Sequence, residues 1–307
     1  MKFAVSLPLD HVEPRGEFQA PAAAREIARI VDDSGVDGCY LTDHPAPSSH
    51  WLRNTVGGHD ALDPFTGLAF LAAAPDRVKL LSSIVVLPYR NPFITAKAAA
   101  SLQLLSGNRF ILGVGVGYQK VEFDALGVAF EQRGALTDEA LETIRLAWAG
   151  GPVAKKGRNF HAVENEPRPV PSPAPLIWVG GGSGKAAERA ARWGDGWAPV
   201  YFPAIEDGRV RSGAGVESIA ELSGKIARIN DLRASLGKSG PFDVAVSRPR
   251  MPLDKTRALA DQLGEEVAMF REAGVTWFNI GIPAESRAAY KDNLSWFVEE
   301  VIRRCAR

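Results

Sequence analysis

Short apolar runs alternate with longer amphipathic segments along the whole chain. Residues 2–7 form an apolar run that is typical of a strand. In residues 21–34 the apolar positions Ala24, Ile27 and Val31 recur at helical spacing, and Gly35 follows as a typical helix end. The same reading predicts eight strands, at residues 2–7, 38–42, 78–87, 110–116, 176–179, 196–200, 242–247 and 275–281.

Each predicted strand is followed by a predicted helix, at residues 21–34, 64–74, 92–105, 137–149, 185–193, 219–236, 255–273 and 285–303. Eight such units in 307 residues match a (β/α)8 TIM barrel, which typically takes about 250 residues plus insertions. A doubly wound open sheet shows the same alternation, but the number of units and the length favour the barrel. No domain linker is evident, so we expect one domain over residues 1–307.

The length beyond a minimal barrel falls in residues 45–62, 155–175 and 201–216, as insertions after strands two, four and six. Within the second of these, the proline-rich residues 167–175 cannot form a helix or a ladder strand and predict a rigid connector. The first and third directly follow strands. They are therefore expected at the C-terminal ends of the strands, where barrel enzymes carry their active sites.

The composition argues against several classes of partner. Lysine plus arginine and aspartate plus glutamate both number 36, so the net charge is zero and neither nucleic acid nor an anionic membrane is indicated. We expect no signal peptide and no membrane span. Cys39 and Cys305 make neither a metal-binding spacing nor a disulfide framework, which fits a reduced cytoplasm. The remaining expectation is a cytoplasmic protein with a small-molecule substrate and no metal.

Alternating glycines end the fourth predicted strand, at Gly113, Gly115 and Gly117. They remove side chains from one face of the strand, so that a flat ring or a phosphate can approach the backbone. The alternative is tight packing inside the barrel, where small residues also occur.

A second small-residue segment joins the fifth predicted strand to its helix. It consists of Gly180, Gly181, Gly182, Ser183 and Gly184. Backbone N–H groups at a helix N-terminus form an anion site, and the Ser183 hydroxyl and Lys185 could contribute. The alternative is a flexible turn. A phosphate P-loop does not fit, because Val179 and Ala186 stand where that motif needs glycine and serine or threonine.

Polar and aromatic residues gather after the second and fourth strands. Asp43 and His44 end strand two, and a histidine at that rim can exchange a proton with a bound substrate. Asp43 would orient His44 or hold a cofactor group. A capping or structural histidine is the alternative. Trp51, in the same insertion as His44, and Tyr118, after the fourth-strand glycines, are expected to face the substrate.

These landmarks together resemble the luciferase-like monooxygenase superfamily, and within it the branch that uses the deazaflavin coenzyme F420. The residues that carry the resemblance are MKFAVSLP, GVDGCYLTDH, the run from LDPFTGLAF to GVGVGYQKVEFDALG, APLIWVGGGSGKAAERAARWGDGWAP and AGVTWFNIGIP. The resemblance implies a barrel that is usually dimeric, with the cofactor ring at the C-terminal mouth.

The resemblance also implies roles for particular residues. His44 matches the histidine that faces the reactive edge of the ring, and Ser83–Ile84 matches the family's non-prolyl cis peptide, which presses on the ring. The segments Gly113–Gly117 and Gly180–Gly184 match those that line the ring and the phosphate.

Two positions bear on the choice between F420 and flavin mononucleotide (FMN). Val116 stands where FMN members often have an arginine on the phosphate, and Ser83–Ile84 stands where they often have Ala-Ala. Both favour F420. Tyr118 stands where sugar-phosphate dehydrogenases of this branch have glutamate, which argues against their mechanism.

The sequence thus predicts an oxidoreductase that transfers a hydride between an unidentified organic substrate and F420. An FMN-dependent luciferase-like monooxygenase and a non-catalytic deazaflavin-binding protein remain as alternatives.

Overall fold

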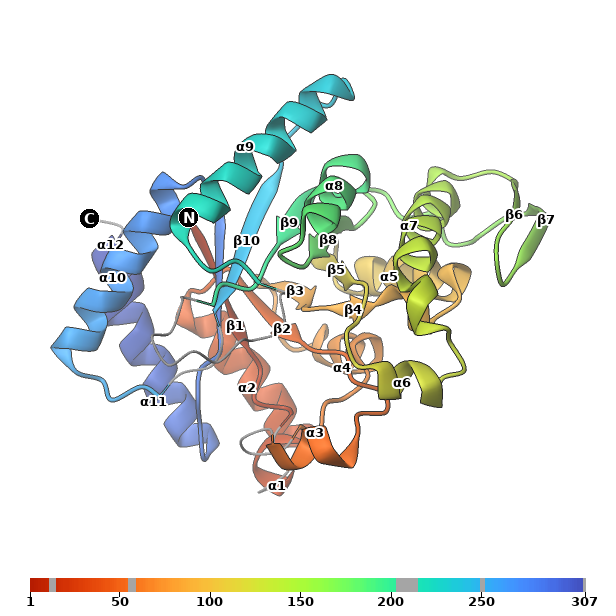
Figure 1. The fold of residues 1–307 in the computed structure, drawn as a ribbon. Helices are drawn as coiled ribbons and strands as arrows, with labels where there is room; N and C mark the ends of the chain where they lie inside the picture. Colours follow the sequence, from red (N-terminus) through yellow and green to blue (C-terminus); the bar gives the residue numbers. More distant parts are fainter. Residues whose placement is uncertain (11–14, 55–58, 203–214, 249–251, 306–307) are drawn as a thin grey trace.

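The barrel predicted from the sequence is present, closed and parallel (Figure 1). The computed structural model describes residues 1–10, 15–54, 59–202, 215–248 and 252–305. Around the barrel the strands are β1 (Lys2–Ser6), β2 (Gly38–Leu41), β3 (Lys79–Ser82), β5 (Phe110–Gly115), β8 (Leu176–Gly180), β9 (Gly196–Ala198), β10 (Asp243–Arg248) and β11 (Trp277–Ile280). Pairing of β3 with β5 and of β1 with β11 closes the ring.

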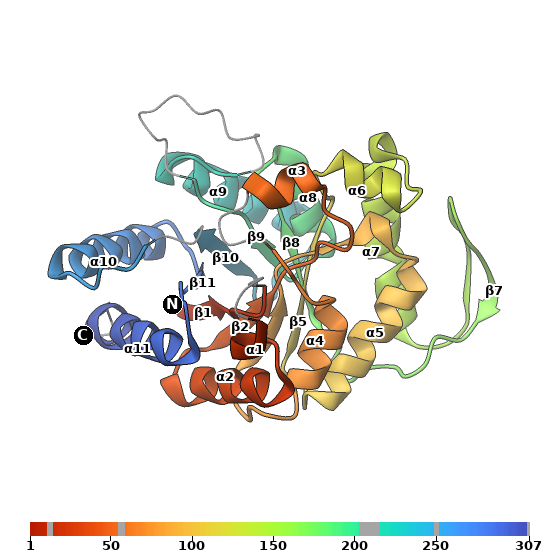
Figure 2. The same cartoon turned by 90° about the horizontal axis from the view of Figure 1, so that it is seen from below.

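A helix follows each barrel strand and packs outside it, as the view from below shows (Figure 2). These helices are α2 (Pro21–Ser34), α4 (Pro64–Leu71), α5 (Pro92–Leu105), α7 (Arg133–Ala149), α8 (Gly184–Trp193), α9 (Ile219–Ser235), α10 (Arg257–Glu272) and α11 (Arg287–Phe297). Local signals explain their ends. Asp63 caps α4 by accepting from Thr66 N, and Gly35 ends α2 in the left-handed region at φ 91°.

The barrel interior is filled by one residue from each strand. These residues are Ala4, Tyr40, Leu81, Ile111, Trp178, Ala198, Ala245 and Trp277. A larger apolar core lies between the strands and the helices. Because side chains alternate along a strand, the residue two positions beyond each inner residue also points inward, nearer the C-terminal mouth.

The third predicted strand, residues 78–87, is wrong in its second half. β3 ends at Ser82, the Ser83–Ile84 peptide bond is cis, and the two-residue strand β4 (Val85–Val86) pairs with β5. A 3₁₀ turn, η1 (Leu87–Tyr89), follows. The cis bond expected from the resemblance is confirmed. The two serines at the break, Ser82 and Ser83, are compatible with a strand, so the residue pattern alone did not reveal it.

The insertions contain elements that the sequence analysis missed. Helix α3 (Ser49–Asn54) lies in the first, and helix α6 (Lys120–Ala125) follows β5. After α7, the strands β6 (Val153–Lys156) and β7 (His161–Asn165) form an antiparallel hairpin that projects away from the barrel (Figure 1). Of the third insertion, residues 203–214 lie outside the described residues.

Candidate functional site

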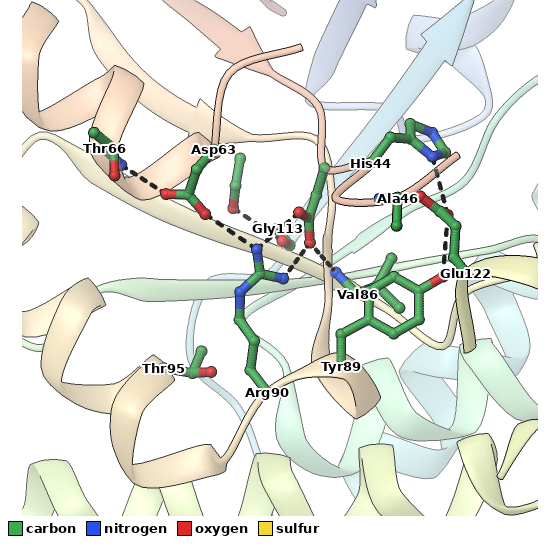
Figure 3. Close-up of polar contacts among 12 residues, drawn as sticks. His44, Ala46, Asp63, Thr66, Val86, Tyr89, Arg90, Thr95, Gly113 and Glu122 are labelled. Atoms are coloured by element: carbon green, nitrogen blue, oxygen red, sulfur yellow. Dashed lines mark hydrogen bonds and ion pairs between the residues drawn. The ribbon is translucent and has the colours of Figure 1, made fainter. Parts of the chain in front are cut away.

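His44 lies just beyond β2, at the C-terminal mouth of the barrel (Figure 3). Its Nδ1 atom is 3.2 Å from Glu122 Oε2 and 3.0 Å from Gln119 Nε2. The side chain is only 13% exposed. Burial lowers the pKa of His44 below its ordinary value of 6.5, and the negative charge of Glu122 partly opposes this. The burial of His44 therefore favours its neutral form.

Glu122, on α6, is the residue that holds His44, and the sequence analysis did not single it out. Its side chain is 1% exposed and accepts hydrogen bonds from Tyr89 Oη at 3.1 Å and from Ala46 N at 3.3 Å. Nδ1 of His44 cannot both donate to Glu122 and accept from Gln119 Nε2. The anchored carboxylate can only accept, so we assign the proton to Nδ1, which donates to Glu122, and the Gln119 amide then makes no hydrogen bond to Nδ1. This leaves Nε2 as the nitrogen available to a reactant. In the sequence, a single glutamate in a helix looks like any solvated position.

Aromatic rings surround His44. The Trp51 ring lies 4.6 Å from the imidazole between centroids, at an interplanar angle of 33°. His59 and Tyr118 lie edge-on at 5.0 and 6.0 Å. The two residues expected to face the substrate are thus brought together beside His44. His59, which the sequence analysis left without a role, lies with its Nε2 3.0 Å from Thr42 Oγ1.

Asp43 makes a different set of contacts from those of its neighbour His44. It accepts from both terminal nitrogens of Arg90, at 2.5 and 2.8 Å, and from Val86 N at 2.9 Å. Arg90 also donates to Asp63 at 3.2 Å. Asp43 was expected to orient His44 or to hold a cofactor group. Its contacts instead tie the end of β2 to the segment after the cis peptide.

The fourth-strand glycines lie against the cis pair. A Cβ atom at Gly115 would come within 2.2 Å of Ile84 Cδ1, and one at Gly180 within 2.7 Å of the same atom. At Gly113 it would come within 2.0 Å of Ser82 O. These three glycines therefore make room for the bulge at residues 82–84. These glycines therefore serve tight packing, which was the alternative to a direct role in binding. Ser83 and Ile84 are partly exposed, so a cofactor on this surface would contact these two residues.

The segment after β8 has the geometry of an anion site. Ser183 caps α8 by accepting from Ala186 N at 3.2 Å, so its hydroxyl already has one partner. Gly182 lies against the backbone of Gly215, whereas a Cβ at Gly184 would meet nothing within 4 Å. Lys225 Nζ donates to Gly182 O at 2.5 Å and also pairs with Glu221 Oε1, so the cation beside this loop already has a carboxylate partner. The open first turn of α8 thus fits a phosphate.

The remaining predicted ring contacts lie at the end of β5. Val116 and Gly117 are partly exposed, and Gly117 has a φ of 77°, which favours glycine. Among the described residues, no group of three or more histidine, cysteine, aspartate or glutamate side chains could hold a metal ion. No described helix is long and apolar enough to cross a membrane.

Enzymes with a closed β/α barrel carry their active sites at the C-terminal mouth. A buried histidine that is hydrogen-bonded to a carboxylate lies at that mouth here, which is typical of an active site. The family model for luciferase-like monooxygenases matches residues 1–291, and the chain belongs to this family.

The chain is also similar to individual members of this family. An uncharacterized protein of Mycobacterium tuberculosis is 30% identical over 81% of both chains. The F420-dependent glucose-6-phosphate dehydrogenase of Nocardia farcinica is 30% identical over 66% of this chain and 63% of its own. A solved F420-dependent secondary alcohol dehydrogenase, in complex with an F420-acetone adduct, superimposes with a TM-score of 0.78 at 18% identity. That alignment covers 100% of this chain and 99% of the other.

Proposed function

We propose that the protein is an F420-dependent oxidoreductase that transfers a hydride between an organic substrate and the cofactor. The observation that carries the proposal is a buried histidine, hydrogen-bonded to a buried carboxylate, at the same barrel mouth as the Ser83–Ile84 cis pair. The F420-dependent dehydrogenase among the relatives supports the choice of cofactor. Val116, which brings no cation to the end of β5, supports it against FMN.

The residues present fit a ring with a phosphorylated tail. Ser83, Ile84 and Val116, with the backbone at Gly117, would contact the ring, and Gly113 and Gly115 would make room for Ile84 behind it. The backbone from Gly180 to Gly184, at the N-terminus of α8, would hold the phosphate, with Lys225 nearby. Bound F420 would supply the ring carbon that accepts or gives the hydride.

His44 would handle the proton that accompanies the hydride. In alcohol oxidation, Nε2 accepts the proton of the substrate hydroxyl, and Glu122 stabilises the resulting imidazolium through Nδ1–H. In the reverse direction the same nitrogen returns the proton to the carbonyl oxygen. Trp51 and His59 pack against the imidazole, and Tyr118, which is 56% exposed, lies at the outer edge of this group.

We further infer from the family resemblance that the chain works as a homodimer of single-domain subunits in the cytoplasm. The substrate is a small molecule, and the residues around His44 set its size.

An FMN-dependent monooxygenase is the second candidate, favoured by the description of the family. One experiment separates the two. The purified protein is incubated with F420 and a panel of secondary alcohols, and then with reduced FMN and oxygen. We expect bleaching of the F420 absorbance by at least one alcohol and no enzyme-dependent oxygen uptake with FMN. Oxygen uptake with FMN and no change in F420 would contradict the proposal.

A further inference from the structure

Three polar residues line one side of the barrel interior at its C-terminal mouth. They are Ser6 at the end of β1, Ser247 on β10 and Asn279 on β11, and we call them the polar arc. Each lies two positions beyond an inner core residue of its strand and so points into the barrel. Their strands are neighbours, with Ser247 opposite Asn279 in the β10–β11 register and Ala4 opposite Asn279 in the β1–β11 register.

Two atoms of the polar arc are buried without a hydrogen-bond partner. Asn279 is 1% exposed and Ser6 is 8% exposed, yet neither Asn279 Oδ1 nor Ser6 Oγ has a partner. The Nδ2 group of Asn279 donates to Ser247 Oγ at 3.3 Å, which fixes the direction of the unpaired Oδ1. Buried polar atoms are nearly always paired, so these two call for a specific explanation.

Another buried amide in the chain shows the usual arrangement. Gln103 is 3% exposed, donates through Nε2 to Pro173 O at 3.1 Å and accepts at Oε1 from Phe110 N at 3.1 Å. Both ends of that amide are paired. Among the described residues, Trp178 Nε1 and Trp277 Nε1 in the inner barrel layer are also buried without a partner, so the unpaired atoms of the polar arc belong to a group that lines the barrel interior.

The hydrogen-bonding chemistry of the polar arc defines its ligand. Asn279 Oδ1 can only accept, so it needs an N–H or O–H donor. Ser247 already accepts from Asn279, which leaves its hydroxyl to donate, and Ser6 lies on the other side with a free hydroxyl. Ser247 lies directly opposite Asn279. Ser6 lies two residues further along β1 than Ala4, the register partner of Asn279, so a donor flanks the acceptor on each neighbouring strand. A deprotonated phosphate or carboxylate offers no donor and would put its charge against Asn279 Oδ1.

The polar arc lies across the barrel from the cofactor surface. In the strand order, β10, β11 and β1 are opposite β3, β5 and β8. Those three strands carry the start of the 82–84 bulge and the glycines that accommodate Ile84. A flat ring that rests on Ile84 therefore turns its far edge, or a substrate bound beside it, toward the polar arc.

We propose that the polar arc is a binding subsite for a neutral group that presents a hydrogen-bond donor beside an oxygen acceptor. Two sources share this chemistry: the imide edge of the deazaflavin ring, C=O–NH–C=O, and a hydroxyl or amide group of the substrate. The inference rests on the proposed function and deepens it, because it specifies that the ligand group bound by the polar arc carries no charge.

The test compares Asn279→Leu with the matched control Gln103→Leu. Melting temperatures of the ligand-free proteins and dissociation constants for F420, from fluorescence titration, are measured for each. We expect Asn279→Leu to melt at or above the wild-type temperature, because it removes an unpaired acceptor, and Gln103→Leu to melt several degrees lower. A drop for Asn279→Leu as large as that for Gln103→Leu would show a structural amide and overturn the proposal.

Binding then identifies the source of the group. If the imide edge occupies the polar arc, Asn279→Leu weakens F420 binding at least tenfold. If the substrate does, F420 affinity stays within twofold and KM for an alcohol oxidised by the wild type rises at least tenfold. Unchanged F420 affinity together with unchanged KM would mean that the polar arc holds water only, and would overturn the proposal. Failure of the wild type to bind F420 would instead count against the proposed function, while the melting comparison would still decide the nature of the arc.

Discussion

His44 is the residue on which the proposed chemistry depends. Its replacement by alanine is expected to lower turnover by about 100-fold or more, the usual range for loss of a general acid or base. F420 affinity should change little, because the surface at Ile84 and the first turn of α8 remain. Steady-state rates and F420 titration check both expectations. His161→Ala, an exposed histidine on the β6–β7 hairpin, is the control, and an equal rate for His44→Ala would remove His44 from the mechanism.

Glu122 controls the protonation of His44. Burial lowers the pKa of His44 and the charge of Glu122 raises it, so Glu122→Gln should lower that pKa further. The acid limb of kcat/KM, where His44 becomes protonated, should then move to lower pH. NMR titration of the imidazole measures the same shift without turnover.

The same pKa links His44 to stability. The unfolded chain binds this proton more readily than the folded protein, so stability should fall as the pH drops below about 6.5, and more steeply in Glu122→Gln. Asp124→Asn, an exposed position on the same helix, is the control. An acid limb that stays in place or moves upward would contradict the assignment of Glu122.

The sequence was enough to predict His44 as a site residue, but not its partners Glu122 and Gln119. A histidine at the end of a predicted strand has a defined place in a barrel. Glu122 and Gln119 reach His44 only through the turn after β5 and the start of α6. No periodicity in the sequence sets the direction of that turn.

At the scale of elements, β5 and β8 are shaped to accept Ile84. A methyl group at Gly115 would meet Ile84 Cδ1 at 2.2 Å, so Gly115→Ala should lower the free energy of unfolding by about 1–3 kcal/mol, as overpacking usually does. Ile84→Val lacks that Cδ1 atom, and the double variant should recover part of the loss. Chemical denaturation of the four proteins gives the coupling.

Gly184→Ala is the matched control for this experiment, because its Cβ would meet nothing within 4 Å. It should leave stability close to that of the wild type. Strictly additive effects of Gly115→Ala and Ile84→Val would show that the two side chains do not compete for one space.

The ion pair between Asp43 and Arg90 joins β2 to the segment after β4. Arg90→Ala leaves the Asp43 carboxylate, 2% exposed, without its charged partner. We expect a loss of about 3–5 kcal/mol in the free energy of unfolding, typical of breaking a buried pair. Arg168→Ala, which breaks an exposed pair with Glu166, should cost at most about 1 kcal/mol. Similar losses for both variants in a denaturation experiment would contradict this role of Arg90.

Helices with clear start and stop signals were predicted well, and elements without such signals were not. The bounds of α2 and α5 agree with the prediction, because proline begins each and small residues follow its end. The β6–β7 hairpin was missed, since its short strands carry exposed polar side chains rather than an apolar alternation. The break after β3 did not follow from the apolar pattern of residues 78–87, and only the family resemblance pointed to the cis peptide at Ser83–Ile84.

At the scale of the whole molecule, the number of β/α units was enough to predict the barrel. Each unit buries one face of a helix against the strands, and eight of them close the ring. The choice of cofactor does not follow from this architecture. It rests on a few local features at the mouth, namely Val116, the Ser83–Ile84 pair and the first turn of α8.

Titration of the purified protein with F420 and, separately, with FMN tests the account most directly. Binding is followed by the change in cofactor fluorescence, at the same protein concentration and ionic strength. The account predicts saturable binding of F420 and no saturable binding of FMN over the same range. Tight binding of FMN without binding of F420 would contradict it.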